Sequence, residues 1–112
     1  MFQSNRRTMT REELLQLHDD MNAASRRIME AKNQDYASQS SPFKNFQRHG
    51  LLGILVRMGD KLQRLENFVE NGTLAVKDES VRDCLLDLQN YCVLFQGFIE
   101  DTKDSSGPER CA

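Results

Sequence analysis

Residues 79–102 read ESVRDCLLDLQNYCVLFQGFIEDT, and this segment decides the fold. Its apolar side chains recur at steps of three and four residues, the period at which side chains share one face of an α-helix. This seam consists of Val81, Leu85, Leu88, Cys92, Phe95 and Ile99. In the second half the remaining sides are also apolar, through Tyr91, Val93, Leu94 and Phe98. Such a helix is central in a bundle or lies in a subunit interface.

Two further helices are expected earlier in the chain. The first runs from Thr10 to about residue 33, and Thr10 with Glu13 forms a capping box at its start. Its apolar stripe is Leu14, Leu17, Met21, Ala24, Ile28 and Ala31. The second covers about residues 50–71 and ends before Gly72, since glycine accepts the left-handed conformation of a helix C-cap. Its stripe is Leu51, Leu55, Met58, Leu62, Leu65 and Val69.

Residues 34–49, QDYASQSSPFKNFQRH, separate the first two helices. Pro42 and the serines predict a loop, while Tyr36, Phe43 and Phe46 are apolar enough to anchor that loop on the domain. The sequence therefore predicts an all-α fold, a compact bundle of three main helices with an aromatic loop between helices 1 and 2. We expect a flexible N-terminus over residues 1–9, a single helical domain over 10–103 and a disordered tail over 104–112.

Composition narrows the classes of function. The chain has 112 residues, with 15 basic and 17 acidic side chains, so its net charge of −2 gives no strong attraction to nucleic acid or to a membrane surface. A chain of this length builds a modest core, which favours a homo-oligomer. Its three cysteines lack metal-site spacing, which is typical of reduced thiols in a cytoplasmic protein. The longest apolar run, around Leu51–Val56, is too short to span a membrane.

An acidic face is the first candidate site. Glu79, Asp83, Asp87 and Asn90 share one side of the third helix. For the first two there is a structural alternative, because Ser80 with Asp83 forms a capping box and acids suit the first turn of a helix. Asp87 lies two turns into the helix, beyond any cap, and so points most strongly to function.

A cationic face on the second helix is the second candidate. Arg57, Lys61 and Arg64 surround Asp60 at helical spacing and could hold phosphates, with arginine making bidentate contacts. The alternative is a solvated face stabilised by local ion pairs. The loop and its approach add aromatic, amide and charged groups that could stack on a base and read its edge, or simply anchor the loop. These groups are Lys32, Asp35, Tyr36 and Asn45.

Taken in order, KNQDYA, SPFKNF, GILVRMGDKLQRLENF and VKDESVRDCLLDLQNY resemble the phage and bacterial family called nucleotide modification associated domain 1. The resemblance covers roughly residues 28–95. It implies a role in phage nucleotide or DNA modification, within the bacterial host cytoplasm. It assigns the shared polar positions to Lys32, Asp35, Tyr36, Asn45, Arg57, Asp60, Lys61, Arg64, Glu79, Asp83, Asp87 and Asn90.

The helical layout is also similar to the MazG-like all-α nucleoside triphosphate pyrophosphatases. Those enzymes hold Mg²⁺ with an EExxE motif on one helix and an ExxD motif on the next, and the oxygen ligands suit that hard cation. The similarity implies a metal set of Asp60, Glu79, Asp83 and Asp87. The second helix departs from the motif, because Asp60 is the single acid where EExxE would place three.

Three functions follow. The first is a phage-type protein that binds a phosphate-bearing nucleotide between helices 2 and 3, for nucleotide modification or to sequester a host signalling nucleotide as an anti-defence. Arg57, Lys61 and Arg64 would meet the phosphates, and the polar face of the third helix would meet hydroxyls, a base edge or one metal, through Asp83, Asp87 and Asn90. The second is a Mg²⁺-dependent pyrophosphohydrolase. The third is a helical protein–protein interaction module without a small ligand, working through the apolar second half of helix 3.

Overall fold

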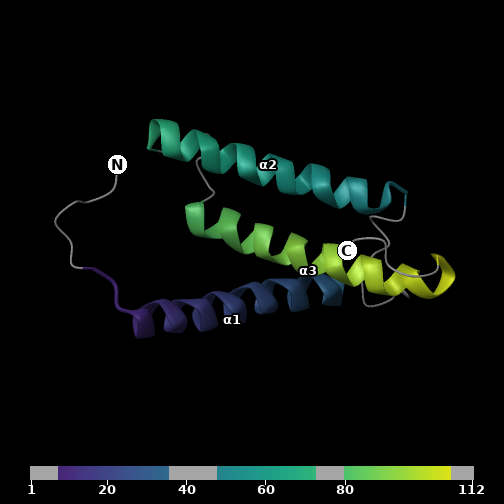
Figure 1. Ribbon diagram of the computed structural model, residues 1–112, viewed down its shortest axis with the longest axis horizontal. Coiled ribbons are helices and arrows are strands. Elements are labelled where there is room, and N and C mark those ends of the chain that lie inside the picture. The colour runs from purple at the N-terminus through teal and green to yellow at the C-terminus, as the bar shows by residue number, and fades with distance from the viewer. Residues whose placement is uncertain (1–7, 36–47, 73–79, 107–112) are drawn as a thin grey trace.

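The structure, a computed structural model, describes residues 8–35, 48–72 and 80–106. For residues 33–35 and 102–106 it describes the backbone alone. Three α-helices account for these residues: α1 (Arg11–Asp35), α2 (Gly50–Asn71) and α3 (Val81–Ser106). α3 lies between the other two, and each of them packs against it (Figure 1). Over the described ranges α1 and α2 do not contact one another. The predicted all-α bundle is therefore confirmed, with α3 as its central helix.

Local hydrogen bonds fix where the helices begin. At the start of α1 the backbone N–H of Glu13 donates to Thr10 Oγ1 at 3.1 Å, and the N–H of Thr10 donates to Glu13 Oε1 at 2.8 Å. At the start of α3 the N–H of Asp83 donates to Ser80 Oγ at 3.0 Å, and the N–H of Ser80 donates to Asp83 Oδ2 at 3.2 Å. Both predicted capping boxes are confirmed.

The end of α2 is set by a glycine. Gly72 has φ of 82°, and its backbone N–H donates to the carbonyl oxygen of Phe68 at 2.7 Å. This is the left-handed cap in which one amide satisfies a carbonyl of the last turn. A side chain with a Cβ would strain that conformation, which is the physical reason that Asn71-Gly72 predicted the end of the helix. α3 continues to Ser106, a few residues beyond its expected end.

The core is small and lies on both sides of α3. Ile54 of α2 and Cys84 of α3 are fully buried, and Leu86 and Ser25 are nearly so. The thiol of Cys84 donates to the backbone carbonyl of Lys61 at 3.4 Å, so its small side chain packs directly against the backbone of α2. Cys84 thus lies in the α2–α3 contact, whereas Ser25 belongs to the contact between α1 and α3.

The face of α2 that packs on α3 differs from the predicted stripe. Leu55, Leu62 and Val69 of that stripe are 53%, 50% and 60% exposed, while Ile54 is fully buried. Lys61 also lies in the contact, where it meets α3. Apolar residues cover more than half the circumference of α2, so a single neighbouring helix covers only part of them. Periodicity located the apolar surface but could not select which part α3 would cover.

None of the described helices combines the length and the apolarity that crossing a lipid bilayer requires. The aromatic loop falls within residues 36–47, which lie outside the described residues.

Candidate functional site

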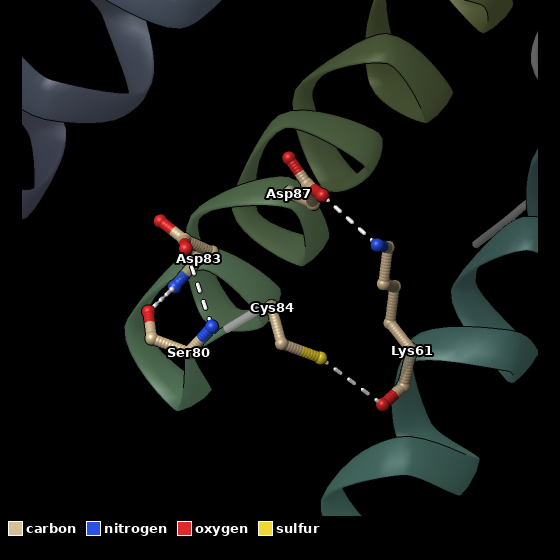
Figure 2. Close-up of polar contacts among 5 residues, drawn as sticks. All are labelled: Lys61, Ser80, Asp83, Cys84 and Asp87. Atoms are coloured by element: carbon tan, nitrogen blue, oxygen red, sulfur yellow. Dashed lines mark hydrogen bonds and ion pairs between the residues drawn. The ribbon is translucent and has the colours of Figure 1, made fainter. Parts of the chain in front are cut away.

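An ion pair joins the two predicted faces. Lys61 Nζ of α2 lies 2.9 Å from Asp87 Oδ2 of α3, with the side chains 12% and 26% exposed (Figure 2). The backbone carbonyl of Lys61 accepts the hydrogen bond from Cys84, one turn before Asp87. The two ends of Lys61 are therefore both held by α3. A charge pair that is this shielded from water interacts more strongly than a surface pair and is screened less by salt.

The acidic residues of α3 have separate roles. Asp83 is exposed, and its carboxylate turns back to the start of its own helix, where it accepts the N–H of Ser80. Asp87, one turn later, points to Lys61 on the neighbouring helix (Figure 2). The interpretation of Asp83 as a capping residue is confirmed. Asp87 belongs to no cap, and its partner in the structure is Lys61. From the sequence, Lys61 was expected on a face of α2 that is solvated or binds phosphate.

The cations of α2 lie on adjoining turns around this pair. Arg57 is one turn before Lys61 and exposed, and Arg64 is one turn after it and half-buried. Residues three and four apart on a helix share a face, so the three cations form one row. Asp60 is exposed on α2. The row begins at the protein surface and enters the contact between α2 and α3 at Lys61.

Asn90 connects the same region of α3 to α1. Its side-chain Nδ2 donates to the backbone carbonyl of Ser25 at 3.0 Å. One residue earlier, Gln89 Nε2 donates to Asn22 Oδ1 at 2.6 Å. Asp87 and Asn90 therefore face α2 and α1 respectively, so the predicted polar face of α3 lies between its two neighbours.

The Gln89–Asn22 contact was missed by the sequence analysis. Amide side chains carry no periodic signal, and only the docking of α1 on α3 reveals that Gln89 and Asn22 meet. Gln89 Oε1 is buried and, among the described residues, makes no hydrogen bond.

Part of the predicted site lies at the edge of the described residues or outside them. Lys32 is exposed near the end of α1, and Asp35 is the last residue of that helix, with its side chain outside the described part. Tyr36, Asn45 and Glu79 lie outside the described residues altogether. The contribution of the loop to a base-binding surface stays a prediction.

The structure gives no support to a metal centre on the described residues. Within residues 8–35, 48–72 and 80–101, no three His, Cys, Asp or Glu side chains are grouped so that they could hold a metal ion. Asp83 accepts a capping hydrogen bond and Asp87 pairs with Lys61. The metal set of Asp60, Glu79, Asp83 and Asp87 stays a prediction, with Glu79 outside the described part.

Comparison with known proteins gives no independent assignment. No protein-family model, curated protein or solved structure matches the chain. The resemblance to nucleotide modification associated domain 1 rests on the residues quoted above.

Proposed function

We propose that this chain is a phage-type nucleotide-binding protein that holds a phosphate-bearing nucleotide between α2 and α3. The observation that carries the proposal is the Lys61–Asp87 pair at 2.9 Å, placed where the two helices meet and continued by Arg57 and Arg64 on the turns before and after it. A row of three cations along one helix matches a chain of phosphates better than a single anion.

The three cations differ in how much of each side chain is exposed to water. Arg57 is exposed and suits a terminal phosphate that retains contact with water, through the bidentate geometry of the guanidinium group. Arg64 is half-buried and Lys61 nearly buried, so water screens their attraction for a phosphate less than it does at Arg57. A nucleotide would therefore bind with its phosphates along this row.

Asp87 orients Lys61 in the absence of ligand. Its carboxylate holds the ammonium group in place, so a phosphate would meet a cation that is already positioned and charged. Figure 2 shows that one oxygen of Asp87 points to Lys61 while the other points away from it. A carboxylate repels phosphate but accepts hydrogen bonds from ribose hydroxyls, so we assign Asp87 to the sugar.

The proposal favours binding over hydrolysis. A Mg²⁺-dependent pyrophosphohydrolase needs several carboxylates directed at one metal, whereas Asp83 and Asp87 serve a helix cap and an ion pair. Phosphate binding through cations requires no metal. A bound nucleotide that is neither hydrolysed nor released would serve either nucleotide modification or the sequestration of a signalling nucleotide.

The test is a panel of mono-, di- and triphosphate nucleosides, cyclic nucleotides and dinucleotides, with and without Mg²⁺. Thermal unfolding reports binding, and mass spectrometry of the recovered solution reports whether each nucleotide is intact. We expect at least one nucleotide to raise the Tm and to be returned unchanged. A panel that yields neither a thermal shift nor a product would refute the proposal, and Mg²⁺-dependent release of pyrophosphate or a monophosphate would establish the hydrolase instead.

Two arginine variants localise the site. Arg57 of α2 and Arg82 of α3 are both exposed, but Arg82 lies two residues before the buried Cys84, so helix geometry turns it away from the contact with α2. We expect Arg57→Ala to reduce the nucleotide-dependent rise in Tm and Arg82→Ala to preserve it. Equal responses of the two variants would show that the binding, if present, is elsewhere.

A further inference from the structure

One face of α2 carries large apolar side chains that the bundle does not cover. Leu52, Leu55, Leu62 and Val69 are each at least half exposed, although α2 already packs on α3 through the side that contains Ile54 and Lys61. Figure 1 shows α2 at one edge of the bundle with α3 on one side only. Contiguous exposed apolar surface on a helix marks an interaction site.

The spacing of this face is that of a helix that packs on another helix. Leu52, Leu55, Gly59, Leu62, Glu66 and Val69 follow steps of three and four residues over the length of α2. These positions form a two-per-heptad seam, the pattern that inserts into the seam of a partner helix. At Gly59 a Cβ would meet no neighbouring atom within 4 Å, so the middle of the seam is open to a partner side chain.

We propose that this seam, residues 52–69 of α2, docks on the same seam of a second copy of the chain, with the two helices antiparallel. A two-fold axis makes the same patch serve on both copies, as in most homodimers. The small core of one chain, in which Ile54 and Cys84 are the fully buried side chains among the described residues, also favours burial of further apolar surface by a copy.

Charge selects the antiparallel arrangement. Glu66 is the charged member of the seam, and Arg48 is exposed just before α2 begins. A parallel copy would place Glu66 beside its equivalent, so like charges would face each other. An antiparallel copy that aligns Leu52 with Leu62 and Leu55 with Gly59 places Glu66 next to the start of the partner's α2, on the side from which Arg48 enters that helix. In this register the two copies of α2 overlap over residues 50–64, about 22 Å of helix at 1.5 Å per residue, and Val69 lies beyond the overlap.

The test measures mass by sedimentation equilibrium from micromolar to millimolar protein. We expect the wild-type chain to reach about twice its mass of 12.9 kDa. Leu55→Glu should remove the dimer, because it places a carboxylate in the middle of the seam. Leu15→Glu is the matched control, since Leu15 of α1 is 56% exposed against 53% for Leu55 and lies on a different helix. Circular dichroism checks that each variant keeps its helices.

Charge reversal tests the arrangement without disturbing the apolar residues. Arg48→Glu and Glu66→Arg should each weaken association at least several-fold, and the double variant should restore it. A chain that stays monomeric at all concentrations would overturn the proposal and assign the seam to a different protein or to the remaining segments of this chain. A dimer unaffected by Leu55→Glu, or single variants that the double variant does not rescue, would equally overturn it. No nucleotide is present, so the outcome is independent of the proposed function.

Discussion

The Lys61–Asp87 pair should couple α2 to α3 measurably. At 2.9 Å the direct Coulomb attraction is about 6 kcal/mol for an effective dielectric constant of about 20. Desolvation of both groups offsets most of this attraction. Exposed pairs contribute about 0.2–1 kcal/mol, and breaking a fully buried pair costs about 3–5 kcal/mol. With 12% and 26% of the side chains exposed, we expect a coupling free energy of about 1–2 kcal/mol.

Single and double substitutions give distinct expectations. Asp87→Ala removes the carboxylate that lies 2.9 Å from the Lys61 ammonium group, where only 12% of the lysine side chain reaches water, so we expect a loss of about 2–3 kcal/mol in the free energy of unfolding. Lys61→Met leaves the more exposed carboxylate behind and should cost about 1–2 kcal/mol. Lys61→Met with Asp87→Leu replaces both charges by apolar groups and should come within about 1 kcal/mol of the wild type.

Urea unfolding at constant protein concentration, followed by circular dichroism at low and high salt, measures these values. The chain offers its own control in Arg26–Glu30, a pair at 3.6 Å with side chains 80% and 62% exposed. We expect a coupling of about 0.3–0.5 kcal/mol there, lost in high salt, while the Lys61–Asp87 coupling persists. A Lys61–Asp87 coupling no larger than that of Arg26–Glu30 would refute the claim that this pair holds the two helices together.

Local structure gives further expectations. Thr10→Ala and Ser80→Ala should each lower the free energy of unfolding by about 1 kcal/mol, because each removes the side-chain acceptor of a capping box. Gly72→Ala should cost about 1–2 kcal/mol in the same urea titration, since φ of 82° strains a residue with a Cβ. Cys92 is exposed and Cys84 buried, so a thiol reagent should modify Cys92 in the folded protein and Cys84 only after unfolding. Rapid modification of Cys84 would contradict its burial against the backbone of α2.

The helices could be predicted because their signals are local. The capping boxes at Thr10 and Ser80 and the glycine at the end of α2 depend on residues within one turn of each other. Apolar periodicity likewise needs only one segment at a time. The three helices and their order followed from such signals, while the central place of α3 was one of two alternatives that the sequence left open.

The rotation of α2 could not be predicted in the same way. The apolar residues of α2 include both the side around Ile54 and the seam from Leu52 to Val69. The spacing of apolar residues does not indicate which of these two sides packs on α3. The side that packs on α3 also contains Lys61, which pairs with Asp87, 26 residues further along the chain. Sequence reasoning identified both residues as candidates for function and assigned them to a ligand, whereas in the structure they contact each other.

Amide shift mapping by NMR tests the proposed function most directly. The chain is titrated with the nucleotide that raises the Tm most, and backbone amide shifts are followed along all three helices. We predict that the largest changes occur at residues 57–64 of α2 and 83–90 of α3, with saturation at one nucleotide per chain. Changes confined to the start of α1 or to residues far from Lys61, or no change with any nucleotide, would contradict binding between α2 and α3.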